Sequence, residues 1–155
     1  MPKIDIAALP ELNSTGYPAP FSDLVKGRFR KRLGDAGALT QFGVNLCRLE
    51  PGAASAQRHW HEREDELVYV LDGELVLIED EGETVIRAGD AASFKAGIRN
   101  GHHLVNRSGR DALVLEIGTR DLNDRGEYSD IDMVFVCEDG VDRFLHRNGS
   151  PYPPR

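Results

Sequence analysis

The sequence predicts an all-β fold, a single small barrel or sandwich. From Arg28 onward, short apolar runs are interrupted about every ten residues by Gly, Asp or Asn, which is typical of such folds. No segment has a convincing amphipathic helical period. The chain of 155 residues, 40% of them hydrophobic, suits one core. We expect an extended N-terminal arm over residues 1–27, a barrel core over 28–120, and C-terminal strands and tail packed on the barrel over 121–155.

Individual strands follow from alternation or from apolar runs bounded by turn residues. In Thr40–Leu49 the apolar residues at 42, 44 and 46 share one face, and Gln41 and Asn45 lie on the other. Asp72-Gly73 is a tight-turn dipeptide. Further strands are expected at Arg28–Leu33, Glu66–Leu71, Gly73–Ile78, Thr84–Arg87, Ala91–Phe94, His103–Val105, Ala112–Ile117, Asp132–Cys137 and Val141–Leu145.

Charge and composition exclude several classes of partner. The net charge of -7 argues against nucleic acid, whose phosphates require clustered Lys and Arg. The nearest basic patch is Arg28, Arg30, Lys31 and Arg32, which we interpret as the solvated face of an edge strand. The first residues lack the features of a secretory signal, and no apolar run is long enough to span a membrane. We therefore expect a cytoplasmic protein without a membrane partner, with Cys47 and Cys137 as ordinary buried thiols.

The residues between 59 and 66 predict a metal site. In an extended chain His59 and His61 project to the same side, and Glu66 opens the next strand and can bring a carboxylate to the same ion. A second histidine pair, His102-His103, follows some forty residues later, so four of the five histidines fall in two groups. An acidic run at residues 79–83 is interpreted as a polar turn, because a metal cluster needs ligands from different strands.

These motifs resemble those of the cupin superfamily. The first cupin motif is matched, with one extra residue after its first glycine, by Gly52, His59, His61, Glu66 and Gly73. The second is matched by Gly89, Gly97, His102 and Asn106, but Lys95 replaces the usual proline and two extra residues precede the histidine. The longer loop leaves His103 as a possible substitute for His102.

The resemblance implies a fold, a cofactor and an assembly. The fold would be the double-stranded β-helix, or jelly-roll barrel, of a small single-domain cupin. One divalent metal ion, Mn, Fe, Ni or Zn, would be held by His59, His61, Glu66 and His102, leaving positions open for water or substrate. Single-domain cupins often dimerise. Strands that are apolar on both faces also suggest that a second copy covers the outer face, so we expect a homodimer.

Several functions are compatible with this resemblance. One is a metal-dependent enzyme acting on a small oxygen-rich metabolite, either a sugar phosphate isomerase or a dioxygenase; isomerisation would also need a general base that the sequence does not identify. The alternatives are a module that binds or senses a small molecule without transforming it, and a barrel whose metal only braces its strands. Gln41 and Asn45 are candidate pocket residues, Lys95 and Arg99 are candidate phosphate anchors, and Asp130, Asp132, Tyr128 and Tyr152 are expected at the surface.

Overall fold

The computed structural model describes residues 3–153, and nearly all regular structure in them is β. The two helices are short: the 3-10 helix η1 (Phe21–Val25) and the single-turn α1 (Leu33–Ala36). The strands are β1 (Arg28–Arg32), β2 (Phe42–Leu49), β3 (His59–His61), β4 (Glu66–Asp72), β5 (Glu74–Glu79), β6 (Gly82–Arg87), β7 (Ala91–Phe94), β8 (His103–Val105), β9 (Ala112–Thr119), β10 (Arg125–Tyr128), β11 (Val134–Glu138) and β12 (Val141–Leu145). No helix within this range combines the length and apolar character that crossing a membrane requires.

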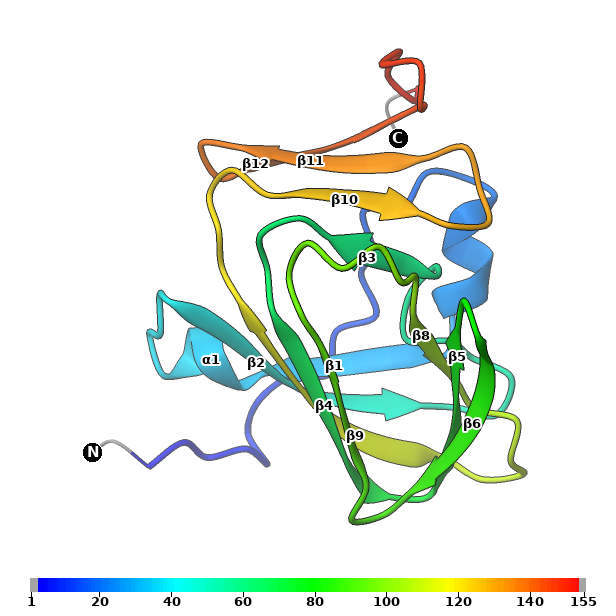
Figure 1. Cartoon of the computed structure of the whole chain (residues 1–155). Coiled ribbons are helices and arrows are strands. Elements are labelled where there is room, and N and C mark those ends of the chain that lie inside the picture. The colour runs from blue at the N-terminus through cyan, green and yellow to red at the C-terminus, as the bar shows by residue number, and fades with distance from the viewer. Residues whose placement is uncertain (1–2, 154–155) are drawn as a thin grey trace.

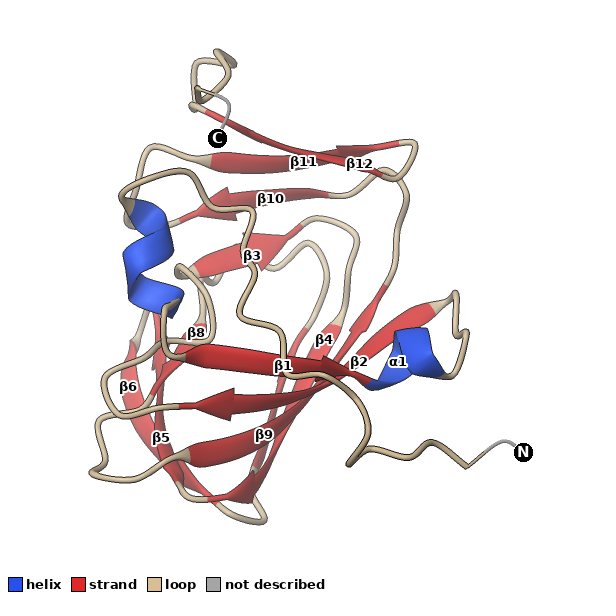
Figure 2. Cartoon of the chain, turned by 180° about the vertical axis from the view of Figure 1, so that it is seen from behind, coloured by secondary structure: helices blue, strands red, loops and turns tan. Residues whose placement is uncertain are grey.

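Antiparallel sheets form two facing walls (Figures 1 and 2). One wall is the five-stranded sheet β1-β2-β9-β4-β7. The other consists of the sheets β6-β5-β8 and β12-β11-β10-β3, which meet where His59 and His102 form an isolated antiparallel bridge. This arrangement confirms the predicted all-β class and is consistent with a jelly-roll barrel.

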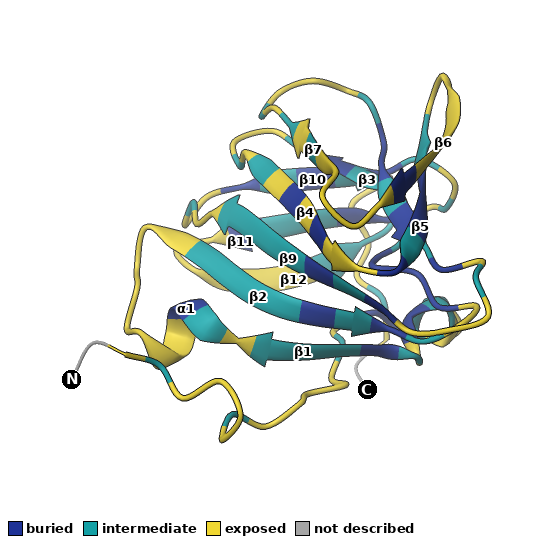
Figure 3. Cartoon of the chain, turned by 90° about the horizontal axis from the view of Figure 1, so that it is seen from below, coloured by how far each residue is buried: buried dark blue, intermediate teal, exposed yellow. Residues whose placement is uncertain are grey.

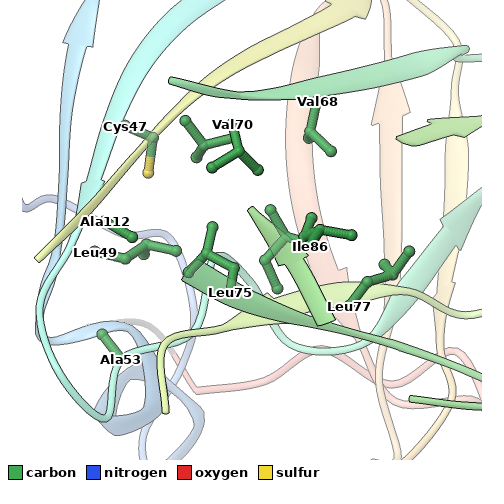
Figure 4. Packing of buried hydrophobic residues seen from close by; sticks show 11 residues of the cluster. Cys47, Leu49, Ala53, Val68, Val70, Leu75, Leu77, Ile86 and Ala112 are labelled. Carbon is green, nitrogen blue, oxygen red and sulfur yellow. The ribbon is translucent and has the colours of Figure 1, made fainter. Parts of the chain in front are cut away.

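Side chains that alternate inward at one end of the barrel form its apolar core (Figure 4). They come from both walls, which is expected because successive residues of a strand point to opposite faces. The buried members are Cys47, Leu49, Ala53, Val68, Val70, Leu75, Leu77, Ile86, Leu104, Ala112 and Val114. The turn that brings β4 to β5 depends on Gly73, whose φ is +88° and whose added Cβ would lie 2.9 Å from the Cα of Ala112.

The N-terminal segment runs across β1 (Figure 2). Leu12 and Arg30 exchange two backbone hydrogen bonds of 2.9 Å, so the arm adds one bridge to the outer edge of β1. A second buried cluster, around Tyr17, Val25 and Met133, holds the arm and η1 against the C-terminal strands. The extended arm is therefore fixed both to the edge of β1 and to the C-terminal strands.

The chain trace differs from the sequence prediction at β1 and β10, and the ends of several other strands are shifted by one or two residues. The strand expected at Arg28–Leu33 ends at Arg32, because Leu33 begins α1. β10 was not predicted, since its sequence contains a single large apolar residue, Tyr128; it forms because it pairs with β3 on one side and β11 on the other. Both cysteines are buried and unpaired, as expected.

Candidate metal centre

Three histidines are brought together by the junction of the two sheets. His59 and His61 lie two residues apart on β3 and project to one side, while Trp60 between them is buried on the other. His102 precedes β8 and exchanges two backbone hydrogen bonds with His59, at 3.2 and 2.9 Å. As a result the His59 and His102 rings lie 5.1 Å apart, and the His59 and His61 rings 4.9 Å apart.

Glu66 faces these histidines from the opposite wall, at the start of β4. Its Oε2 atom lies 2.8 Å from Nε2 of His102, 3.8 Å from Nε2 of His59 and 3.9 Å from Nε2 of His61. The ligand atoms of His59, His61 and Glu66 all lie within 4.8 Å of one another. Three imidazole nitrogens from one wall thus converge on one carboxylate oxygen of the other.

The second ring nitrogen of each histidine faces a fixed acceptor. Nδ1 of His59 is 2.8 Å from the Gln57 carbonyl, and Nδ1 of His102 is 3.3 Å from the Asn100 carbonyl. A carbonyl can only accept, so these Nδ1 atoms donate, and the Nε2 atom of each ring is directed toward Glu66. Metal-binding histidines are commonly oriented in this way, by a hydrogen bond at the other nitrogen.

Asp124 orients the third ring. Its buried carboxylate, 1% exposed, lies 2.5 Å from Nδ1 of His61 and also accepts the Arg63 backbone N–H at 2.8 Å. Burial by itself would lower the pKa of His61, but the hydrogen bond that His61 donates to Asp124 raises it. Asp124 was missed at the sequence level, because nothing local links it to a histidine 63 residues away.

The electrostatics of the group suit a cation. Burial by itself would raise the pKa of Glu66, but the hydrogen bond from His102 and the neighbouring imidazoles hold it at about 2. Burial lowers the pKa of His59 to about 3. At neutral pH Glu66 is therefore ionised and His59 is neutral, which are the forms that ligate a metal.

His103, the alternative to His102, lies apart from this group. Its Nδ1 is 2.9 Å from the Ala56 carbonyl, and burial lowers its pKa. His102 instead stacks face to face on Phe94, with ring centroids 3.5 Å apart and an interplanar angle of 2°, which fixes its ring beside Glu66. The geometry brings His102, and not His103, to the cluster.

A cavity of about 440 Å³ opens beside the four residues, and its lining differs from the one predicted. Asn45 lines it, as expected, from the inner face of β2. Gln41 is exposed and does not line it, and exposed Arg99 lies over the Trp60 ring at 5.3 Å. Lys95 lines a smaller cavity of about 200 Å³ on another side of the cluster.

Two expectations about surface residues are wrong. Arg28 is only 6% exposed and the side chain of Arg30 27%; both line the large cavity, so this part of β1 is not a solvated face. Tyr128 is 5% exposed and also lines the cavity, with its ring packed edge-on against Tyr17 at 5.6 Å. Both differences arise because the arm and the C-terminal strands cover these positions.

Comparison with known proteins identifies the family. The cupin domain family matches residues 45–118. A sugar phosphate isomerase of the cupin superfamily from Silicibacter pomeroyi is 44% identical, with a TM-score of 0.94 over 98% of this chain and 97% of that one. A protein from Acidithiobacillus ferrooxidans, provisionally described as a sugar phosphate isomerase, is 28% identical with a TM-score of 0.74 over 84% of each chain.

A more distant structure shares the fold alone. The polyketide cyclase RemF from Streptomyces resistomycificus is 18% identical, with a TM-score of 0.64 over 78% of this chain and 80% of that one. A comparison with functionally curated proteins found no match. The paired histidine motifs, the jelly-roll walls and the 44% identity agree, and the chain belongs to the cupin superfamily.

Proposed function

We propose that this protein is a metal-dependent isomerase of a sugar phosphate. The observation that carries the proposal is the convergence of three imidazole Nε2 atoms on the Glu66 carboxylate at the wall of a cavity of about 440 Å³. The similarity to a cupin sugar phosphate isomerase over nearly the whole chain supports this reaction class. We favour it over dioxygenation because the relative with 44% identity over 98% of this chain is a sugar phosphate isomerase.

The donor set fits a divalent metal ion. His59, His61, His102 and Glu66 would hold it, and mixed imidazole and carboxylate ligation suits manganese, iron, nickel or zinc. When bound, the ion supplies Lewis acidity that polarises neighbouring oxygens of a sugar. A site with four protein ligands would also leave room for a substrate beside the ion.

The chain's own residues prepare this end of the cavity. Asp124 and the backbone carbonyls of Gln57 and Asn100 fix the imidazole rings, so little reorganisation is needed when a ligand enters. Phe94 covers one face of His102 and restricts the access of water to it. Tyr17 and Tyr128 form an aromatic wall of the same cavity, against which the carbon face of a sugar can pack.

The proposal is tested by metal content and turnover together. Elemental analysis of protein purified without added metal should give close to one divalent ion per chain. The metal-loaded protein should interconvert at least one pair in a panel of aldose and ketose phosphates. The variant His61→Ala should lose both metal and turnover, because an opened chelate binds weakly.

His103→Ala is the matched control, since it removes a histidine from the same cavity but outside the cluster. It should keep its metal. Full metal content in His61→Ala would contradict the ligand assignment. Ligand-induced thermal shifts without turnover of any panel member would instead favour a binding or sensing protein, and oxygen uptake with a substrate would favour a dioxygenase.

A further inference from the structure

Three arginines of β1 face the cavity that contains the metal centre. Arg28, Arg30 and Arg32 are spaced two residues apart, so their side chains project to one face, and all three line the 440 Å³ cavity. Lys31, which lies between them on the opposite face, donates instead to the carbonyl of Ile6. A row of guanidinium groups inside a barrel is costly unless their charge is compensated.

Of the three, only the middle arginine forms a close, two-bond ion pair with a carboxylate of residues 3–153. Glu116, on β9, accepts two hydrogen bonds from Arg30, at 2.6 and 2.9 Å. This two-pronged ion pair neutralises Arg30 and holds it against the inner face of the sheet. The positive charge that remains in the row therefore belongs to its two neighbours.

Arg28 is the more buried of these two neighbours. With 6% of its surface exposed, it donates to the carbonyl of Ser55 at 2.7 Å and more weakly to that of Ser14 at 3.5 Å. It makes no ion pair with a carboxylate among residues 3–153. Carbonyl dipoles offset part of its desolvation, but no anionic group of the described chain contacts it.

Arg32 lies nearer the mouth of the cavity, with its side chain 54% exposed. Its ion pair with Asp35 is long, at 3.7 Å, and the same carboxylate also pairs with Arg120. Asn45 is its register partner on β2 and places an amide on the same inner face. Arg32 and Asn45 together offer hydrogen-bond donors at the entrance.

The arginine row and Glu66 lie on the same five-stranded wall, on strands β1 and β4. β2 and β9 separate β1 from β4, so at about 4.8 Å per strand the backbones of β1 and β4 are roughly 14 Å apart. The arginine side chains of β1 and the Glu66 side chain of β4 therefore line the same cavity from two different sides. A ligand that fills it would have an anionic end at β1 and its polarised oxygens at the histidines.

We propose that Arg28 and Arg32, with Arg30 fixed between them, form a subsite for the phosphate group of the substrate. This inference rests on the proposed function, because it assumes that the cavity binds a sugar phosphate. The planar guanidinium fork matches the oxygens of phosphate, and two forks around one phosphate give both charge and orientation. In a protein of net charge -7, such a pocket is a local exception that selects an anion.

The test measures phosphate binding directly by isothermal titration calorimetry, on metal-loaded and metal-free protein. The probes are inorganic phosphate, glucose 6-phosphate and glucose. Both phosphate-containing probes should bind more tightly than glucose, and Arg32→Gln should weaken them at least about tenfold because a charged hydrogen-bond donor is lost. Arg28→Gln should have a larger effect, and circular dichroism will check that this buried variant folds.

Lys31→Gln is the control, since it removes the same charge from the other face of the same strand. It should leave phosphate affinity unchanged, and all three variants should keep the metal content of the wild type. Equal phosphate binding by Arg32→Gln and wild type would overturn the subsite, as would binding of glucose as tightly as glucose 6-phosphate.

The subsite and the proposed function fail separately. Turnover of a sugar phosphate that is insensitive to Arg32→Gln would keep the isomerase and reject the subsite. Arginine-dependent phosphate binding without turnover of any sugar phosphate would keep the subsite and reject the isomerase.

Discussion

The two halves of the barrel interior are built from the same strands but do different work. On β2, β4 and β9, the inward positions at one end include Leu49, Val70 and Val114, each fully buried. A few residues along the same strands, the inward positions become polar, with Glu66 on β4 and Glu116 on β9. One set of strands thus forms a dry core and a ligand cavity in series.

The difference lies in how each half is stabilised. Apolar side chains gain stability from burial in any well-packed arrangement. Each polar side chain needs its own partner: Glu116 pairs with Arg30, and Asp124 with His61. No buried side-chain nitrogen or oxygen within residues 3–153 lacks a hydrogen-bond partner. We therefore expect changes in the apolar half to reduce stability and changes in the polar half to affect ligand binding.

The largest effect is expected in the apolar half. Leu75 is 1% exposed at its centre, and Leu75→Ala should lower the free energy of unfolding by about 2–5 kcal/mol through lost burial and a cavity. Chemical denaturation of the metal-free protein measures it. At denaturant concentrations below its unfolding midpoint, this variant should still bind one metal ion per chain. Loss of metal from the folded variant would show that the apolar half and the polar half are not independent.

A smaller effect is expected from Asp124, which contacts Nδ1 of His61 and is not one of the four proposed ligands. Asp124→Asn should weaken metal affinity about 10- to 100-fold, because the amide holds the His61 ring less firmly and makes it a poorer donor. Competition with a chelator of known affinity gives the number.

Asp132→Asn is its matched control. It makes the same change at an exposed pair, where Asp132 lies 2.8 Å from Nδ1 of His146. Metal affinity should not change there. Equal weakening in both variants would mean that the effect is electrostatic at long range and not one of ring positioning.

The smallest effect on stability is expected on the outer face of β4, outside both halves. Leu67, Tyr69 and Leu71 alternate along it and are 39%, 40% and 44% exposed. Figure 3 shows the exposed positions of β4 alternating with buried ones. We expect a second copy of the chain to cover this face. Tyr69→Lys should therefore convert a dimeric mass to a monomeric one in light scattering, while the fold loses no more than about 0.5 kcal/mol.

Val85→Lys serves as the comparison, because Val85 is similarly exposed, at 44% against 40% for Tyr69, but lies on β6. It should remain dimeric. A monomeric wild type at working concentration would refute the dimer.

The sequence predicted most strands because alternation is a local property. Ala91–Phe94 and His103–Val105 were predicted to the residue. The candidate ligands His59 and His61 could also be proposed from the sequence, because residues two apart in a strand project to the same side whatever the fold. The choice between His102 and His103 was open, because it depends on which residue bridges to β3.

Other features depended on distant partners. Alternation put the β1 arginines on one face, but it did not say which face of that strand is buried. Phe29 points outward beneath the Arg48 guanidinium, at 4.4 Å, while Arg30 points inward to a carboxylate 86 residues later in the chain.

The sequence by itself determined where strands and turns lie and which side chains share a face, because backbone geometry repeats every two residues. Only the tertiary structure decided which face became the interior and which charges are paired inside it. The physical reason is that burying a charged group depends on a partner, and here the partners, Glu116 for Arg30 and Asp124 for His61, come from strands and loops far away in the chain.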